Sequence, residues 1–407
     1  MSRTRRPRIV VAGCGVAGSL VAHGLRGRDD VELIALERVL AADHADSGTG
    51  LNIGPNALES LDSLDAALAA DLRAASLPWR GWRIELADGT PLMDLPLAQV
   101  ADRDGVRIRW STLYELLRGR VADRLRFGCE ARGVEPQPDG RLSVRLDAAG
   151  GPQRLDDVDL LLVADGRYSR LREAALGRPA VRQLGVAIAR LLVPDTSGGL
   201  VDDYVQIFNG SARLLGFRVL PAHLYLTAAL PLAADAEIPT EMRTGEQLRR
   251  AFAPATGAWS PAAAFMVDAL ARHESALHWA RMQEADAAWS AHGGRMLFLG
   301  DAAHPMVPTL GQGATQAFED AACAVGMLRA ALDAAATAGA GLDAAAVTRA
   351  VEARRAERVR FVAALSWAAS DTMLAGADPV AGAREKSSAP FRAQLRRLYR
   401  EAATARP

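Results

Sequence analysis

The stretch Gly13-Cys14-Gly15-Val16-Ala17-Gly18 decides the fold of this chain. It follows a short apolar, β-branched run at 8–12 and precedes a helical pattern that extends to about residue 28. A second apolar run, at 31–36, leads directly into Glu37. A strand, a glycine-rich turn, a helix, a second strand and a terminal acid together form the βαβ fingerprint of dinucleotide binding.

Each part of this fingerprint has a physical role. Gly13 allows the tight turn, Gly15 lets the backbone approach a pyrophosphate, and Gly18 lets the helix pack closely on the strand. The carboxylate of Glu37 is placed to accept hydrogen bonds from an adenosine ribose. The fingerprint therefore predicts a dinucleotide site, although by itself it does not separate FAD from NAD.

The rest of the chain alternates between predicted strands and helices. We predict strands at 82–86, 106–110, 125–129, 141–147, 160–164 and 295–299, helices at 111–124, 314–332 and 343–372, and a loop at 333–342. Apolar runs between 181 and 232, separated by Gly, Pro, Asp and Asn, predict an antiparallel sheet. The predicted fold class is α/β (α+β): a Rossmann-like domain at 1–180 with inserted strands at about 75–110, a mainly antiparallel substrate domain at 181–285, a return to the first domain at 286–335, and a C-terminal helical region at 336–407.

The composition points to a small partner. The 407 residues carry 48 basic and 48 acidic side chains and are 50% hydrophobic, which argues against disorder and gives no electrostatic reason to expect nucleic acid or an anionic membrane. The three cysteines form no CxxC pair and the histidines no HExxH, so we expect neither disulfides nor a metal. The arginines near the start imitate a signal peptide, but the glycine motif follows at once, and we expect a cytoplasmic protein that does not span a membrane.

Two further motifs lie in order along the chain. Ala164-Asp165-Gly166 is followed by Ser169 and Arg172, and Gly300-Asp301-Ala302-Ala303-His304 is followed by Pro308 and Gly311-Gln312-Gly313. With the first motif, they resemble the single-component FAD-dependent aromatic hydroxylases of the para-hydroxybenzoate hydroxylase fold, the group A flavoprotein monooxygenases. The segment 51–57 is similar to that of hydroxylases acting on salicylate, urate and hydroxypyridine acids, 6-hydroxynicotinate 3-monooxygenase among them.

The resemblance spans nearly the whole chain and implies an activity. It implies a FAD-binding Rossmann-like domain, reduction of FAD by NADH or NADPH, reaction with O2 to a C4a-hydroperoxyflavin, and hydroxylation of a small electron-rich aromatic or N-heteroaromatic ring. The partners it implies are this small substrate and O2, and we expect a monomer or homodimer.

The resemblance also implies roles for individual residues. Asp301 would accept hydrogen bonds from the flavin ribityl chain, although a helix N-cap would use the same oxygens. The glycine turn before the helix at 314 would set free N–H groups against the flavin pyrimidine edge. Asp165 would contact FAD and NAD(P)H, unless it only ends a strand. The full implied cofactor set is Gly13, Gly15, Val16, Ala17, Gly18, Glu37, Arg38, Arg109, Asp165, Gly300, Asp301, Gly311, Gln312, Gly313 and Ala314.

Substrate and catalytic residues are inferred by position in similar folds. The substrate set is Asn52, Phe208, Phe217, Tyr225 and Pro308, each of which fits a plain core residue equally well. His304 is the candidate acid–base group, because imidazole titrates near working pH and a phenolic ring must lose its proton, but a structural role is the alternative.

Two departures from the family pattern affect the cofactor. Asp46 and Trp110 stand where many relatives carry arginines that hold the FAD or the reductant, while Arg109 is displaced to the other side of its strand and Arg38 replaces part of the lost charge. These departures leave open a flavin reduced by a partner reductase, or a non-enzymatic flavin-binding sensor. A flavin-dependent halogenase is disfavoured, because it needs a lysine near the flavin and Lys386 is the only lysine.

Overall fold

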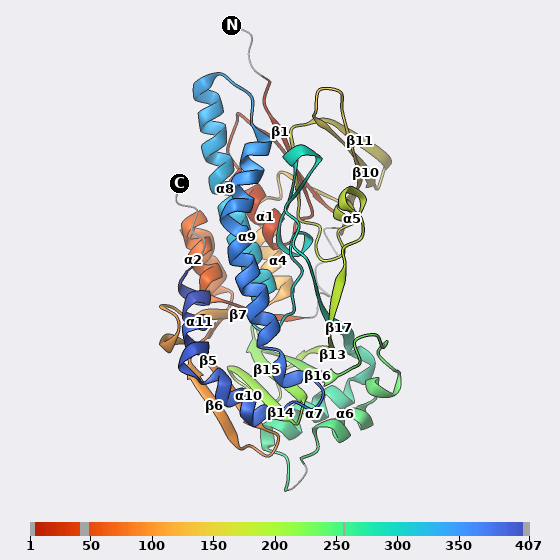
Figure 1. Cartoon of the computed structure of the whole chain (residues 1–407), viewed down its shortest axis with the longest axis vertical. Helices are drawn as coiled ribbons and strands as arrows, with labels where there is room; N and C mark the ends of the chain where they lie inside the picture. The colour runs from red at the N-terminus through yellow and green to blue at the C-terminus, as the bar shows by residue number, and fades with distance from the viewer. Residues whose placement is uncertain (1–4, 41–48, 255–256, 402–407) are drawn as a thin grey trace.

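A six-stranded sheet in the upper half of the molecule carries the glycine motif (Figure 1). The computed structural model describes residues 5–40, 49–254 and 257–401. The strand order is β18 (Ser290–Ala291), β19 (Met296–Phe298), β12 (Leu160–Val163), β1 (Arg8–Ala12), β2 (Glu32–Glu37) and β8 (Leu125–Phe127). All neighbours pair in parallel except β18 with β19.

This sheet is covered on both faces, which explains its nearly continuous apolar strands. Alternate residues such as Ile9 and Val11 pack with α1 (Val16–Gly24), α4 (Trp110–Gly119) and α8 (Gln312–Ala338). Their neighbours Val10 and Ala12 pack on the opposite face, against α5 (Arg170–Leu176) and a three-stranded antiparallel sheet. That small sheet consists of β9 (Cys129–Pro136), β10 (Leu142–Ala148) and β11 (Gly151–Val158).

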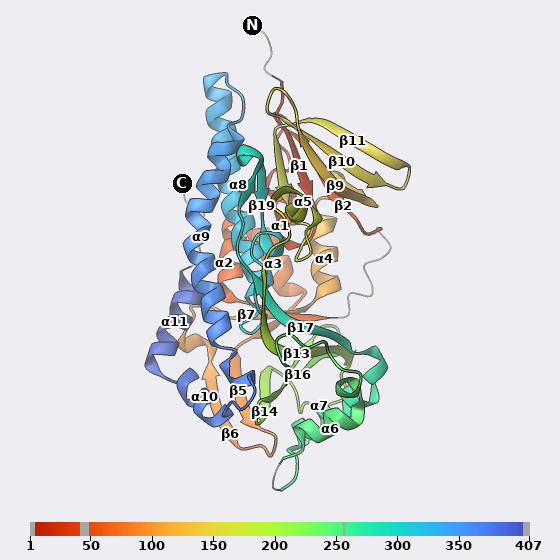
Figure 2. The same cartoon turned by 45° about the vertical axis from the view of Figure 1, so that its right-hand side comes forward.

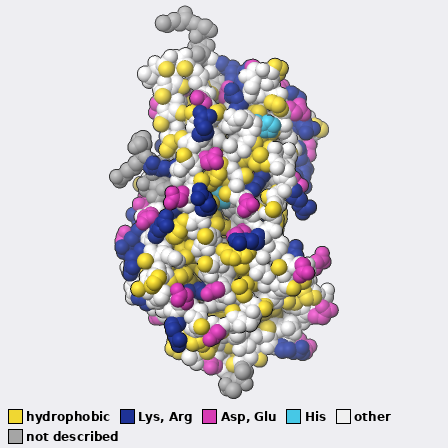
Figure 3. All heavy atoms as spheres, in the orientation of Figure 1, with side chains coloured by type: hydrophobic (Ala, Val, Ile, Leu, Met, Phe, Trp, Pro, Cys, Tyr) yellow, Lys and Arg dark blue, Asp and Glu magenta, His cyan; other side chains and the backbone are white. Residues whose placement is uncertain are grey.

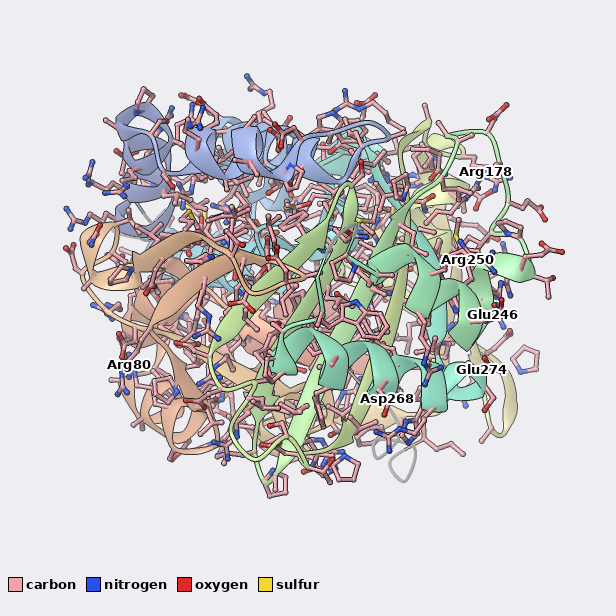
Figure 4. All side chains as sticks on the ribbon, turned by 90° about the horizontal axis from the view of Figure 1, so that it is seen from below. Arg80, Arg178, Glu246, Arg250, Asp268 and Glu274 are labelled. Atoms are coloured by element: carbon pink, nitrogen blue, oxygen red, sulfur yellow. The ribbon has the colours of Figure 1, made fainter. Side chains whose placement is uncertain are left out.

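A seven-stranded sheet fills the lower half (Figures 1 and 2). Its order is β17 (His278–Ala285), β13 (Val181–Pro194), β16 (His223–Pro231), β15 (Ala212–Val219), β14 (Tyr204–Asn209), β5 (Gly81–Leu86) and β6 (Pro91–Pro96). One face rests on α6 (Gly245–Phe252) and α7 (Pro261–Arg272). Seen from below, these helices close that end of the molecule, and the labelled Glu246 and Arg250 of α6 point outward (Figure 4). The other face of the sheet is turned toward the six-stranded sheet.

The remaining elements join the two halves. A third sheet runs β3 (Gly50–Ile53), β7 (Gly105–Arg109), β4 (Leu77–Trp79), next to α2 (Pro55–Leu64) and α3 (Ala66–Ala74). Helix α9 (Ala344–Ala368) runs beside α8, and α10 (Pro379–Lys386) and α11 (Ala389–Arg400) pack on the β14–β5–β6 part of the lower sheet (Figure 1). The 3₁₀ turns are Leu97–Gln99, Glu241–Arg243, Glu274–Ala276, His292–Gly294, Gly300–Ala302 and Asp371–Met373.

The predicted α/β class is confirmed, with local corrections. The predicted loop at 333–342 is wrong over 333–338, because its alanines extend α8 and the helix ends only where Gly339 adopts φ +60°. The first helix ends at Gly24 rather than near 28, and β14 pairs in parallel with β5 inside the expected antiparallel sheet. The domain boundaries themselves stay a prediction.

Helix α8 is long and apolar enough to pass a length-and-composition test for a membrane span. However, its first half is buried between α1, α2 and α9, and a core helix passes the same test. Basic and acidic side chains are interspersed over the face drawn in Figure 3, as expected from the zero net charge.

Candidate functional site

A cavity of about 690 Å³ lies between the two large sheets. Sixteen of the residues predicted from sequence line it: Gly13, Gly15, Val16, Ala17, Glu37, Arg38, Asn52, Asp165, Phe217, Tyr225, Gly300, Asp301, Pro308, Gly311, Gly313 and Ala314. Gly18, Arg109, Phe208, Gln312 and His304 do not line it, and Asp46 falls outside the described residues. Three separated motifs therefore meet around one space.

The first glycine motif forms the upper end of the cavity. Gly13 has φ +90°, and a Cβ on it would lie 2.6 Å from the Ala164 carbonyl oxygen. A Cβ on Gly18 would lie 1.9 Å from the Gly13 carbonyl oxygen, so Gly18 serves close packing of α1 on β1. Gly15 is the N-cap of α1 and supplies no side-chain cap, which leaves first-turn N–H groups available to an anion.

Glu37 closes the end of β2. Its Oε2 accepts from the Cys14 N–H at 3.0 Å and from Arg118 Nη2 at 2.8 Å, and its Oε1 accepts from the Val39 N–H at 3.1 Å. Each carboxylate oxygen has two lone pairs, so Glu37 retains capacity for a ribose hydroxyl. Arg38, the next residue, is exposed and also lines the cavity.

A second uncapped helix end meets the same cavity. Gly311, with φ +65°, is the N-cap of α8 and makes no side-chain cap, while Gly313 and Ala314 of the first turn line the cavity. A Cβ on Gly313 would have Asp301 Oδ1, at 3.6 Å, as its nearest neighbour. Arg167 Nε lies 3.6 Å from Asp301 Oδ2. The α8 end is therefore open toward the cavity and carries the positive end of a helix dipole.

Asp165 adds an orphaned polar atom to this wall. Its Oδ1 is buried and has no hydrogen-bond partner, and burial raises the pKa of Asp165 to about 6. Two open helix N-termini and an unsatisfied carboxyl oxygen are the features that a dinucleotide would complete. The residues present thus fit an anionic dinucleotide cofactor.

One face of α4 lines the cavity with residues that the sequence analysis did not assign. Three residues spaced four apart lie on this face and form what we call the α4 column: Trp110, Tyr114 and Arg118. The Trp110 and Tyr114 ring centroids lie 4.4 Å apart, and Arg118 Cζ lies 4.2 Å from the Tyr114 centroid. The i, i+4, i+8 spacing was the signal that would have revealed the column.

The lower sheet supplies the cavity floor. Strand alternation and register put Ile188, Arg190, Thr227, Tyr225, Arg213, Leu215, Phe217 and Tyr204 on one face, and all eight line the cavity. Among the described residues, neither Arg190 nor Arg213 has a carboxylate ion-pair partner. Buried Arg213 Nε and Thr227 Oγ1 have no hydrogen-bond partner. Burial lowers the pKa of Arg213, against the effect of nearby Tyr204 and Tyr225.

The two floor tyrosines are neutral donors. Burial raises the pKa of both Tyr204 and Tyr225. The Tyr204 hydroxyl accepts from Gln206 Nε2 at 3.1 Å, and Arg190 donates to the Tyr225 hydroxyl. Each O–H remains available to a ligand oxygen. Two guanidinium groups that have no carboxylate partner in the described part of the chain, beside two O–H donors, make this floor suited to an anion.

His304 is placed behind the site. Its Nε2 lies 2.7 Å from Asp320 Oδ2, its ring packs against Trp289, and only 3% of the residue is exposed. Arg109 does not line the cavity, its charge acts on His223, and Phe208 is buried in the core of the lower sheet. The structure therefore does not bring these three side chains to the cavity.

A buried polar network, which we call the α8–α9 network, supports the cavity from behind. Asp320 Oδ2 accepts from the Gly300 N–H at 2.8 Å, and Asp320 Oδ1 accepts from Arg355 Nε at 2.8 Å. Arg355 Nη1 lies 2.6 Å from Glu319 Oε2, and all three charged side chains are fully buried. Gln312, Gln316, Asn56 and Arg358 complete the network. Gln312 is thus a network residue rather than part of the cavity wall.

The described part of the chain contains neither a metal-binding cluster nor a disulfide bond. Within residues 5–40, 49–254 and 257–401, no cluster of His, Cys, Asp and Glu is arranged to hold a metal ion. The cysteines Cys14, Cys129 and Cys323 are free thiols.

Comparison with known proteins gives concordant results. A model of the FAD binding domain matches residues 7–360. A 3-amino-4-hydroxybenzoate 2-monooxygenase of Streptomyces platensis is 32% identical over 376 residues, covering 88% of this chain and 86% of that protein. A 6-hydroxynicotinate 3-monooxygenase of Pseudomonas fluorescens is 25% identical, covering 78% of this chain and 82% of that protein. The crystal structure of Klebsiella pneumoniae HpxO with FAD and uric acid aligns with a TM-score of 0.75 at 22% identity, over 98% of this chain and 96% of that one.

Proposed function

Because this chain belongs to the FAD-binding family of aromatic monooxygenases, we propose that it hydroxylates a small aromatic ring that carries both a hydroxyl and a carboxylate group. The observation that carries this proposal is the cavity floor, where Arg190 and Arg213 have no carboxylate partner among the described residues. A substrate similar to 3-amino-4-hydroxybenzoate or 6-hydroxynicotinate carries a carboxylate that could pair with these two arginines.

Charge distribution along the cavity supports this assignment. Of the acidic residues that line it, Glu37, Asp165 and Asp301 belong to the six-stranded sheet and its adjoining turns, and Glu130 belongs to β9 of the small three-stranded sheet. The floor contributes two arginines and no acid. A buried guanidinium without a partner is costly, and a substrate carboxylate would remove that cost through charge-assisted hydrogen bonds.

The cofactor is FAD, and we assign its site to the upper end of the cavity. The open N-terminus of α1 would hold the pyrophosphate, Glu37 a ribose, Asp301 and Asp165 the ribityl side, and the open N-terminus of α8 the pyrimidine edge. FAD, when bound and reduced by NADH or NADPH, supplies the activation of O2 and the oxygen atom transferred to the ring.

The floor residues would orient and activate the substrate. Neither a histidine nor a carboxylate is among the floor residues, so a protein base is absent from this part of the described structure. We infer that the two guanidinium groups favour the ionised ring hydroxyl by charge alone, while the O–H groups of Tyr204 and Tyr225 donate to substrate oxygens. The apolar side chains of Ile188, Leu215 and Phe217 exclude water from the ring.

The experiment that tests the function measures NAD(P)H oxidation, O2 uptake and product together. The panel is 4-hydroxybenzoate, 3-amino-4-hydroxybenzoate, 6-hydroxynicotinate, urate and a 4-quinolone, each carboxylate compared with its carboxamide. We expect stimulation by carboxylates and at least tenfold weaker binding of carboxamides. A neutral quinolone preferred over every carboxylate would refute the anionic substrate class.

A variant of Arg213 makes the test specific. Arg213→Met keeps the length of the side chain and removes the charge, so it should raise the Kd of carboxylate substrates by roughly ten- to a hundredfold while changing that of carboxamides little. Equal losses for both ligands would show a packing defect instead.

The reductant is tested separately. Anaerobic stopped-flow mixing of the FAD-loaded protein with NADH or NADPH, with the best substrate present, should reduce the flavin rapidly. Reduction that requires an added reductase would support the partner model, and bound FAD without any substrate-stimulated turnover would support a sensor. We expect a monomer or homodimer in the cytoplasm. Three free thiols are consistent with a reducing compartment.

A further inference from the structure

The α4 column brings a tyrosine hydroxyl to the glycine motif. A Cβ placed on Gly15 would lie 3.8 Å from the Tyr114 hydroxyl oxygen, its nearest neighbour outside the turn. Gly15 is the uncapped N-terminus of α1, and the charge of Asp301 also acts on Tyr114. The hydroxyl therefore faces the point where an anion meets the first turn of α1.

The hydrogen-bonding state of Tyr114 makes it a donor toward the cavity. The Trp110 indole N–H donates to the Tyr114 oxygen, so the phenol's own proton is not needed there. Burial raises the pKa of Tyr114 to about 12, so the phenol is neutral at physiological pH. A neutral O–H beside an anion site is available for a charge-assisted hydrogen bond.

Arg118 fixes the ring and is itself engaged elsewhere. Its Nε donates to the Cys14 carbonyl oxygen at 2.8 Å, and its Nη2 lies 2.8 Å from Glu37 Oε2. Its guanidinium covers the Tyr114 ring at 4.2 Å. The charge of Arg118 is thus balanced by Glu37, and its contact with the ring holds Tyr114 in place.

We propose that Tyr114 binds a pyrophosphate oxygen of FAD by donating its O–H, and that Trp110 and Arg118 act as positioning residues for it. This inference depends on FAD binding and is independent of the substrate class proposed above.

The test uses Tyr114→Phe, which removes the hydroxyl and keeps the ring beneath Arg118. Titration of the full-length apoprotein with FAD, followed by flavin fluorescence, should give a Kd raised by roughly ten- to a hundredfold. The ³¹P resonances of bound FAD should also move relative to wild type. Tyr399→Phe is the control, since it makes the same chemical change at a buried tyrosine that lies outside the cavity, and it should change neither value.

Two outcomes would overturn the proposal. A Kd for Tyr114→Phe within twofold of wild type would show that the hydroxyl does not contribute to binding. A raised Kd with unchanged ³¹P resonances would place the hydroxyl on a ribose or the flavin ring instead of the pyrophosphate.

A second variant covers the case in which Tyr114→Phe does not fold. Trp110→Phe keeps the phenol but removes the indole N–H, so it should raise the Kd for FAD several-fold and move the same ³¹P resonances. A Trp110→Phe protein identical to wild type in both measurements would refute the positioning role of Trp110. Substitution of Trp110 by arginine should steepen the salt dependence of FAD binding, because it adds a screened ionic contact. An unchanged slope would argue against this face of α4 lying near the phosphates.

Discussion

Removing the charge of Arg355 should destabilise the protein strongly, because the α8–α9 network then keeps two buried carboxylates with too little positive charge. Arg355, Glu319 and Asp320 are all fully buried, and Arg358 is the remaining arginine paired with Glu319. Breaking a buried pair by deleting one partner costs about 3 to 5 kcal/mol. With an unfolding entropy of about 2.1 cal/mol/K per residue, Arg355→Met should lower the Tm by about 4 to 6 °C.

The pH dependence of this loss has a definite sign. Burial by itself raises the pKa of Asp320 and Glu319, but His304 and Arg355 beside Asp320, and Arg355 and Arg358 beside Glu319, hold both pKa values below their ordinary range. In wild type these carboxylates therefore contribute stability above about pH 4, which is lost only in stronger acid. Without Arg355, burial dominates, the folded-state pKa values rise, and the variant regains stability as pH falls through them.

The assay is thermal unfolding followed by circular dichroism at pH 5.5 and pH 8.0, with FAD saturating in both. Arg349→Met, the same chemical change at an exposed position of α9, is the control and should shift the Tm by less than about 1 °C. A deficit for Arg355→Met that is under 1 °C at pH 8.0, or that grows at pH 5.5, would refute the charge argument.

Three further predictions concern the cofactor end of the cavity. Gly18→Ala should lower both the Tm and the flavin content of the purified protein, because its Cβ would lie 1.9 Å from the Gly13 carbonyl oxygen; a normal visible spectrum and Tm would contradict the packing argument. Gly313→Phe should leave the apoprotein Tm unchanged but reduce flavin content, since only Asp301 Oδ1, at 3.6 Å, approaches a Cβ there; full flavin retention would remove Gly313 from the site. Asp165 has its pKa raised to about 6 by burial, so its folded state binds a proton more tightly than the unfolded chain, and its contribution to apoprotein stability is lost as pH rises from about 4 to 7. In Asp165→Asn, the urea concentration at the unfolding midpoint should vary less between pH 5 and 7 than in wild type. The same pH dependence in both proteins would count against a buried, protonatable Asp165.

The parts of the fold that the sequence predicts are those with local signals. Strand β1, the glycine turn, α1 and β2 follow from apolar runs and from glycines whose spacing has one geometric purpose. The end of α8 was missed because the alanines at 333–338 have high helix propensity but no pattern of buried residues. Most of the predicted site residues on motifs line the cavity for the same local reason, since each motif ends a strand or begins a helix, but Gly18, Gln312 and His304 do not.

Residues whose roles depend on tertiary contacts were not found from sequence. Arg190 and Arg213 are single charges within otherwise apolar strands, and only the register of β13, β16 and β15 puts them on one face. His304 was a candidate base because of its type, but Asp320, sixteen residues later, holds it behind the cavity. Partners so far apart in sequence give no periodic signal that a single sequence reveals.

The division of the lower sheet into two faces has a practical consequence for redesign. The residues at 188, 190, 213, 215 and 227 reach the cavity, whereas their neighbours at 189, 191, 214, 226 and 228 anchor the sheet on α6 and α7. These cavity-facing positions alternate along three adjacent strands and can be varied together in a combinatorial library. They are separate from the turns that line the cofactor end of the cavity. On the proposed function, libraries confined to these positions should change which ring is accepted while leaving flavin loading, and therefore the colour used to screen colonies, intact.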